Sequence, residues 1–203
     1  MKKNICILLL ALCAYNVSFS QVIMEDDFES NQYNWSELAG DKGTALIKDG
    51  VLHLESPWNG GGTIFSTCYA PFDINKPFIL SVEALAKKVS SSKTFGILLD
   101  YEDNQNYILF STSDDEAVLE IWKENRLVGY KIESVKLPKG KKVGLEFEVE
   151  YNLNELIFKV NGIRAMSYRR RISKDDFLLG TSGIGFLVKR GAVIDFDNLK
   201  VVQ

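Results

Sequence analysis

The sequence predicts an all-β fold, a two-sheet antiparallel jelly-roll sandwich, and three observations support this prediction. Apolar and polar residues alternate in short runs along most of the chain, as expected for strands with one buried face. Turn-forming clusters such as KDG, WNGGG, EDNQN, LPKG and VNG separate these runs. No long amphipathic helix pattern occurs, and the best short helix candidate covers residues 173–179.

The first twenty residues have the pattern of a secretory signal peptide. Two lysines precede an apolar run over residues 5–14, and the small residues Ser18 and Ser20 end the segment. The run is far shorter than the ~20 residues that a membrane-spanning helix needs. We therefore expect residues 1–20 to be removed and residues 21–203 to form one exported domain, with no membrane insertion of the mature chain. Periplasmic, cell-surface and released destinations all remain open.

The expected strands follow one another from residue 51 to the C-terminus. In chain order they cover residues 51–56, 78–86, 94–101, 106–113, 117–123, 143–150, 155–160, 183–188 and 192–201. The strand that begins at Val143 places Glu146, Glu148 and Glu150 on one face and apolar residues on the other. A two-residue turn at Leu153 and Asn154 keeps the apolar faces of the next two strands together. The pairs it predicts are Tyr151 with Leu156, Val149 with Phe158, Phe147 with Val160 and Glu148 with Lys159.

Composition narrows the classes of partner. Without Lys2 and Lys3 the mature chain has 22 basic and 27 acidic residues, a net charge of −5. Nucleic acids and anionic membrane surfaces call for a basic field, so neither is an expected partner. Only Cys68 remains of the three cysteines. The mature chain therefore has no internal disulfide, and we expect Cys68 to be a buried apolar residue.

Several segments in this order resemble the concanavalin A-like lectin and glucanase superfamily, particularly bacterial laminin-G-like and 3-keto-disaccharide hydrolase-like domains. They are DDFES followed by Trp35, KDGVLHLES, FGILLDYEDNQNYILFS, the hairpin ending in KVNG, and GIGFLVKRGAVIDFDNLKV. Together they span most of the mature chain. The resemblance implies a jelly roll whose first and last strands lie close together, with a concave face or rim loops available for a ligand.

The glutamate strand is also similar to a catalytic motif of that superfamily. Its family 16 glycoside hydrolases use E-x-D-x-E or E-x-D-x-x-E, so Glu146 would match the nucleophile and Glu150 the acid/base, with Glu148 in place of the aspartate. The two carboxyls of a retaining enzyme lie only about 5–5.5 Å apart. Engagement of Glu148 by Lys159 makes this convergence less favourable. The structural interpretation, a solvent-facing strand surface, is the one we prefer.

Two loops offer ligand-binding side chains. Trp58 and Asn59 stand beside three glycines in ESPWNGGGTIF, where an exposed ring could stack on a sugar and the backbone could approach it closely. The segment LLDYEDNQNY supplies phenol, carboxylate and amide groups that suit sugar hydroxyls. The candidates in it are Tyr101, Asp103, Asn106 and Tyr107. The structural alternatives are a packed rim loop and an ordinary turn.

Acidic residues near both ends suggest a structural calcium site. If the terminal strands adjoin, as the resemblance implies, Asp27, Asp195 and Asp197 could contribute to the six to eight oxygen ligands that calcium accepts. The structural interpretation, in which these carboxylates only bind nearby backbone, is the one we prefer. His53, the only histidine, is expected to be a partly exposed strand residue rather than a metal ligand.

Taken together, the sequence predicts an exported, non-catalytic binding module for a polysaccharide or a surface glycan. A glycoside-cleaving enzyme of the same superfamily is the first alternative. A protein-interaction or adhesion module that binds an envelope protein is the second. No cofactor other than the calcium ion is expected.

Overall fold

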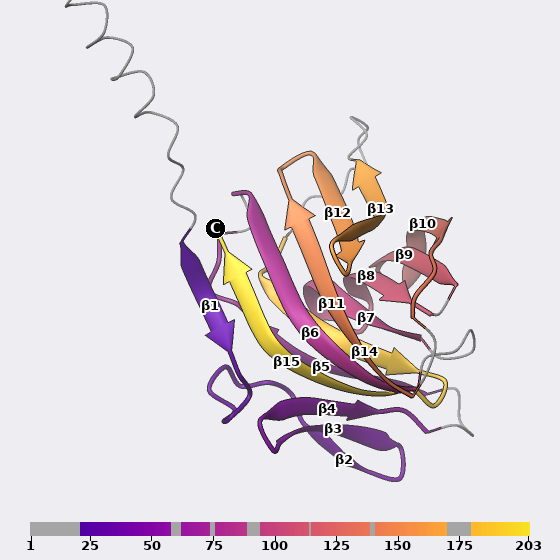
Figure 1. Ribbon diagram of the computed structural model, residues 1–203. Coiled ribbons are helices and arrows are strands. Elements are labelled where there is room, and N and C mark those ends of the chain that lie inside the picture. The colour runs from indigo at the N-terminus through magenta and orange to yellow at the C-terminus, as the bar shows by residue number, and fades with distance from the viewer. Residues whose placement is uncertain are drawn as a thin grey trace, which may run out of the picture.

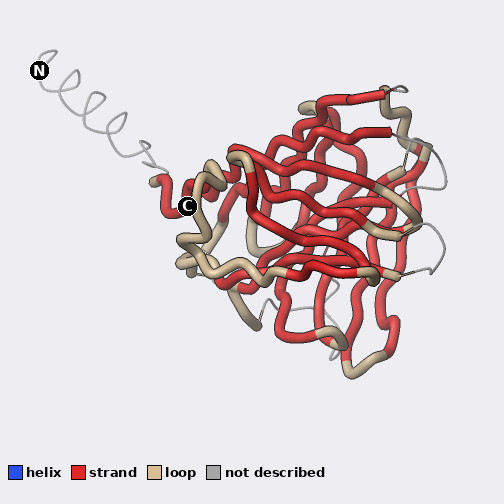
Figure 2. The backbone as a smooth tube through the Cα atoms, turned by 90° about the horizontal axis from the view of Figure 1, so that it is seen from below, coloured by secondary structure: helices blue, strands red, loops and turns tan. Residues whose placement is uncertain are grey.

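The computed structural model describes residues 21–57, 62–73, 76–88, 94–113, 115–138, 141–169 and 180–203. The predicted signal peptide, the predicted ligand residues Trp58 and Asn59, and the helix candidate at 173–179 lie outside these ranges. Within them the chain consists of strands joined by turns and loops (Figure 2). The described part contains no helix with the length and apolar character required to cross a membrane.

The strands form two antiparallel sheets that face each other, which confirms the predicted sandwich (Figure 1). The first sheet has nine strands. Their order is β13 (Ile163–Arg169), β12 (Glu155–Val160), β11 (Lys141–Tyr151), β6 (Phe78–Lys88), β15 (Val193–Val202), β4 (Val51–Glu55), β3 (Gly43–Lys48) and β2 (Leu38–Gly40), with β1 (Val22–Asp26) also paired to β15.

The second sheet has six strands. Their order is β10 (Arg126–Ser134), β9 (Glu116–Lys123), β8 (Asn106–Thr112), β7 (Thr94–Asp103), β14 (Gly183–Lys189) and β5 (Thr63–Tyr69). Strands β10 and β5 are therefore its two edges. Every pairing in both sheets is antiparallel, so each strand presents alternate residues to the core and to solvent.

Aromatic side chains fill the space between the sheets. Phe147 on β11 and Phe158 on β12 stack with ring centroids 5.7 Å apart, and Phe110 of the six-stranded sheet stacks on Phe158 at 5.2 Å. All three rings are fully buried, and burying one such side chain contributes about 1.5–3 kcal/mol. The β11–β12 register is the one predicted, with Phe147 opposite Val160.

The first and last strands, β1 and β15, lie side by side, as the resemblance implied. The backbone N–H groups of Gln21 and Gln203 each donate to the other residue's carbonyl, at 2.7 and 2.9 Å. Asp26 at the end of β1 is buried and accepts hydrogen bonds from the Trp35 indole at 2.8 Å and the Phe28 N–H at 3.0 Å. Trp35 in turn stacks on Phe186 of the second sheet, so these contacts tie the N-terminal segment to the core.

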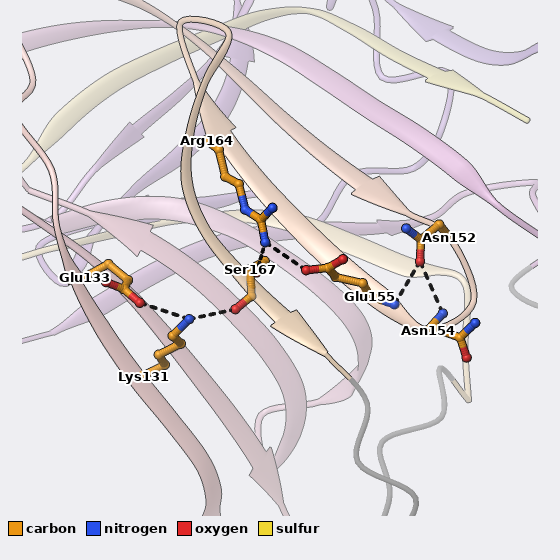
Figure 3. A network of polar contacts seen from close by, with 7 residues as sticks. All are labelled: Lys131, Glu133, Asn152, Asn154, Glu155, Arg164 and Ser167. Atoms are coloured by element: carbon orange, nitrogen blue, oxygen red, sulfur yellow. Dashed lines mark hydrogen bonds and ion pairs between the residues drawn. The ribbon is translucent and has the colours of Figure 1, made fainter.

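A polar network joins the sheets at the side where β10 and β13 form their edges (Figure 3). Lys131 on β10 donates to the Ser167 carbonyl on β13 at 3.0 Å and pairs with Glu133 at 2.9 Å. Arg164 binds the Glu155 carboxylate at 2.8 Å and the Ser167 hydroxyl. Strand β10 is thus held in place although its outer side has no neighbouring strand in the sheet.

Candidate functional site

The outer face of the six-stranded sheet has a row of aromatic side chains, which we call the aromatic row. It consists of Tyr69 on β5, Tyr101 on β7, Tyr107 on β8 and Trp122 on β9. Tyr107 is directly opposite Trp122, and Trp122 is opposite Leu127 on β10, which continues the row to the sheet edge. At the other end, Tyr69 is opposite Gly183 on β14, which lies beside Tyr101.

The rings of the row are fixed by a small apolar cluster beneath them. Leu98, Leu109 and Leu187 are buried on this outer face, and the half-buried rings of Tyr101 and Tyr107 pack against them. Tyr107 and Trp122 stack with centroids 6.2 Å apart. Tyr101, Tyr107 and Trp122 are therefore held in place, so this part of the row needs little ordering when a ligand binds.

A β-bulge brings Tyr101 into the row. Ile97 and Leu99 point into the core, so simple alternation would send Tyr101 inward as well. The pairing of β7 with β8 shifts between Leu99 and Asp103, and Asp100 has a left-handed φ of 51°. Three residues of β7, 100–102, stand opposite one residue of β8, Tyr107, and the Tyr101 side chain lies on the outer face, where it contacts the apolar cluster.

The Asp100 carboxylate stabilises this bulge. One of its oxygens accepts the backbone N–H groups of Gly180 and Thr181, both at 2.7 Å. Burial raises the pKa of the Asp100 carboxyl, although these two hydrogen bonds oppose the rise. The residue thus anchors the segment that leads into β14 against the strand that carries Tyr101.

The hairpin next to the row contains the other two ligand residues predicted in this segment. Asp103 accepts hydrogen bonds from the Gln105 N–H at 2.7 Å and the Asn106 amide at 2.9 Å, and Asn106 accepts the Glu124 N–H at 3.0 Å. Both side chains therefore build the turns. Asn106 also lines, with Tyr107, Trp122, Lys123 and other residues, a pocket of about 460 Å³ at the strand ends.

The outer face of the nine-stranded sheet has a different character. A cleft of about 530 Å³ lies over β11, β6, β15 and β4, and its lining includes Glu83, Glu146, Asp195 and Asp197. Glu146 is opposite Glu83, and Glu83 is opposite Asp197, so three carboxylates lie abreast on adjacent strands. We call Glu146, Glu83 and Asp197 the carboxylate row. Within the described part of the chain, Glu83 and Glu146 form no ion pair.

The two other glutamates of β11 are neutralised. Lys159 on β12 binds Glu148 at 2.6 Å and Glu150 at 3.0 Å, and these hydrogen bonds raise the pKa of the lysine. The pairing of Glu148 with Lys159 confirms the predicted register. Glu150 is held at Lys159 and does not line the cleft, whereas Glu146 does. The structure therefore places Glu146 beside Glu83 rather than with Glu150.

Two of the predicted calcium ligands, Asp195 and Asp197, line the cleft, whereas Asp27 lines a separate pocket. Asp195 accepts a hydrogen bond from His53 Nδ1 at 2.6 Å and binds Lys87, while Asp27 and Asp197 accept the N–H groups of Glu29 and Asn198. No three carboxylate, histidine or cysteine side chains in the described ranges are grouped so as to hold a metal ion. The hydrogen bonds of Asp27 and Asp197 agree with the structural interpretation, and the calcium site stays a prediction.

The structure also tests what the sequence predicted for the exposure of His53 and Cys68. The prediction that His53 is partly exposed was wrong: only 8% of the residue is exposed, because it is bound to Asp195 on the neighbouring strand. Cys68 is buried, as predicted, and burial raises the pKa of its thiol. Neither residue offers a reactive group to solvent.

Comparison with known proteins identifies the architecture. No family model and no curated protein sequence matches the chain. An endo-acting O-glycanase, of the kind that prominent members of the human gut microbiota express to initiate mucin breakdown, shares 14% identity over 90% of this chain and 99% of that chain, with a TM-score of 0.64. A Bacillus subtilis protein of unknown function with a galectin-like fold shares 12% identity over 90% and 97% of the two chains, with a TM-score of 0.65.

The catalytic domain of an endo-1,3-β-glucanase (laminarinase) from Thermotoga petrophila shares 11% identity over 92% of this chain and 99% of that domain, with a TM-score of 0.61. The chain has the concanavalin A-like, galectin-like fold. At these identities the likeness concerns the fold.

Two residues of the aromatic row were not among the predicted ligand residues of this concanavalin A-like chain. Trp122 follows Ala117, Leu119 and Ile121, which all face the core, so alternation alone could have placed its ring on the solvent side. Tyr69 alternates in the same way with the buried Cys68. Their alignment with Tyr101 and Tyr107 depends on the register between distant strands, which no local pattern reveals.

Proposed function

We propose that this chain is an exported, non-catalytic glycan-binding module that holds sugar rings against the aromatic row. The observation that carries the proposal is a line of aromatic side chains, three of them held by packing, on a sheet face that solvent reaches. Aromatic rings bind the apolar faces of sugars, and phenol and amide groups beside them can bond the hydroxyls. The fold likeness to a mucin-degrading O-glycanase and a laminarinase supports a carbohydrate ligand.

The test is binding of the mature domain, residues 21–203, to an array of polysaccharides and in affinity gels. Removing one stacking ring with Tyr107→Ala or Trp122→Ala should weaken glycan binding about two- to twelvefold. Trp122→Phe, which keeps an aromatic face, should retain most of the affinity. Ile79→Ala removes an exposed apolar side chain from the other sheet and serves as the control.

Thermal unfolding of each variant separates lost binding from lost folding. Wild-type protein that is retained by no glycan would disprove the proposal. Retention that is unchanged by both Tyr107→Ala and Trp122→Ala, in folded protein, would show that the ligand binds elsewhere.

A second candidate function, glycoside cleavage, is favoured by the opposed carboxylates of the cleft. Directly opposite residues on antiparallel strands have Cβ atoms about 4.5–5.5 Å apart, so the Glu83 and Glu146 carboxyls can reach the 5–5.5 Å separation of a retaining glycosidase. In that case Glu83→Gln or Glu146→Gln should lower hydrolysis about 10²–10⁴-fold in a reducing-sugar assay. Wild-type protein that releases no sugar from any polysaccharide it binds would exclude this alternative.

A further inference from the structure

We infer that the aromatic row binds an internal stretch of a long, uncharged polysaccharide that lies across the strands, rather than a single sugar or a chain end. The inference rests on the proposed function and specifies its ligand. Three features of the row support it: its length, its open ends and its lack of net charge.

The row crosses the full width of the six-stranded sheet. It begins with Tyr69 on the edge strand β5 and, through Leu127, reaches the opposite edge strand β10. Six strands separated by about 4.8 Å give a length of roughly 24 Å. A ligand that contacts the whole row must therefore be an oligomer.

The row is continuous across β14, which contributes no ring to it. The strands of Tyr69 and Tyr101 lie on either side of β14, two strand spacings or about 9.6 Å apart. A Cβ atom at Gly183 between them would lie 1.9 Å from the Tyr101 carbonyl oxygen, so β14 has no side chain at this position. The Tyr101 ring reaches across β14 to within 5.8 Å of the Phe65 ring on β5, so the surface that a ligand can follow is not interrupted there.

Neither end of the row is closed. Tyr69 exposes 63% of its surface and Leu127 exposes 46%, each on a strand at the edge of its sheet. A site for a chain terminus needs a wall that stops the ligand. Here both terminal residues of the row are open to solvent, so a polymer can continue past β5 and past β10.

The row itself is electrically neutral. Burial raises the pKa of the Tyr101 and Tyr107 phenols, which keeps both protonated. Glu120 on the same face accepts the Trp122 indole N–H at 2.9 Å and lies 3.9 Å from the Lys189 ammonium. The side chains of the row thus carry no charge, and the pocket beside Tyr107 and Trp122 is lined by both acidic and basic residues. The net negative charge of the mature chain disfavours an anionic polymer.

The experiment compares ligand length and ligand charge. The intact mature domain is titrated with mono- to octasaccharides of cello-, xylo-, manno- and laminari-series, followed by Trp122 fluorescence and calorimetry. Affinity gels then contain hydroxyethylcellulose, xyloglucan, galactomannan or laminarin as neutral polymers, and carboxymethylcellulose, polygalacturonate or alginate as acidic ones. We expect affinity to rise at least tenfold from disaccharide to hexasaccharide in the series that binds, and retention by neutral gels only.

Variants at the ends of the row sharpen the test. Tyr69→Ala and Leu127→Ala should each weaken polymer binding about two- to twelvefold and leave disaccharide binding within twofold, while Ile79→Ala changes neither. Equal affinity for a monosaccharide and a hexasaccharide would overturn the inference and leave the proposed function intact. Retention by acidic gels alone would overturn it as well. The absence of binding to any glycan would disprove the proposed function, and the inference with it.

Discussion

The two sheets of this sandwich have similar inner faces and opposite outer faces. Inward, both present buried aliphatic and aromatic residues to the shared core. Outward, the six-stranded sheet presents the aromatic row, whereas the nine-stranded sheet presents the carboxylate row and a cleft of about 530 Å³. The same alternation of residues thus builds one core and two chemically distinct surfaces.

The faces also differ in how their polar groups are satisfied. On the aromatic face the Tyr101 hydroxyl donates to Asn104 at 2.8 Å and the Trp122 indole donates to Glu120 at 2.9 Å, so the polar ends of these two rings have partners. On the acidic face Glu83 stands opposite Glu146, and like charges in that position repel. The surface that we propose for binding has no such opposition between its rings, whereas the acidic surface retains a local conflict of the kind found at functional sites.

The largest expected effect comes from a glycine substitution in the six-stranded sheet, for which a glycine in the nine-stranded sheet provides the control. In Gly183→Ala the new Cβ would lie 1.9 Å from the Tyr101 carbonyl oxygen, so the backbone that carries the aromatic row must move. We expect a loss of about 3 kcal/mol in the free energy of unfolding, at the upper end of typical overpacking costs. Urea unfolding followed by tryptophan fluorescence measures it.

Gly144→Ala is the matched control in the cleft. No atom lies within 4 Å of the position its Cβ would take. Alanine is also less flexible than glycine in the unfolded chain, so this variant should be unchanged or more stable by up to about 1 kcal/mol. Equal losses in the two variants would show that the contact between β14 and Tyr101 is not as close as the structure has it.

The next effect concerns Asp195, the acidic residue at the edge of the cleft that does have partners. Asp195→Asn removes the charge that His53 and Lys87 bind, and we expect a loss of about 1.5 kcal/mol near neutral pH. Burial acts to raise the pKa of this carboxyl, but the hydrogen bonds from Lys87 and His53 outweigh it, so the pKa is lowered.

The lowered pKa gives this prediction a pH dependence. The stabilisation by Asp195 is present above the unfolded-state pKa of about 3.9 and is lost as the pH falls through the lower folded-state pKa. The difference in unfolding free energy between wild type and Asp195→Asn should therefore shrink below about pH 4. A difference that stays the same or grows as the pH falls below about 4 would contradict the ion pairs at Asp195.

The sequence was most informative where the pattern is local. Alternation and one tight turn predicted that Glu148 faces Lys159, because the two strands adjoin in the chain and share a hairpin. The aromatic row was predicted in part: Tyr101 and Tyr107 were selected for their polar groups, in a segment that also looked like a turn. The bulge at Asp100 that turns Tyr101 outward depends on the backbone N–H groups of residues 180 and 181, about eighty positions away in the chain.

The cleft was less predictable for the same reason. Glu146 was noticed because it alternates with Glu148 and Glu150, but its neighbour Glu83 lies on β6, which precedes it by more than fifty residues. Nothing in the β6 sequence shows that this strand inserts between β11 and β15. The distinction between neutralised and unpaired glutamates therefore follows from tertiary register alone.

The smallest expected effect tests that distinction directly, because two glutamate substitutions on this face should change stability in opposite directions. Glu83→Gln removes repulsion toward Glu146 and Asp197 and should raise the free energy of unfolding by about 0.5 kcal/mol. Glu148→Gln weakens the 2.6 Å pair with Lys159 and should lower it by a similar amount, about 0.5 kcal/mol. Both changes are measured by urea unfolding at low ionic strength, and 1 M salt, with a screening length of about 3 Å, should reduce both. If Glu83→Gln instead destabilises the protein, the carboxylate row is held together by a partner rather than by the fold alone. The acidic face could then no longer be contrasted with the aromatic face as a surface of unpaired, repelling carboxylates.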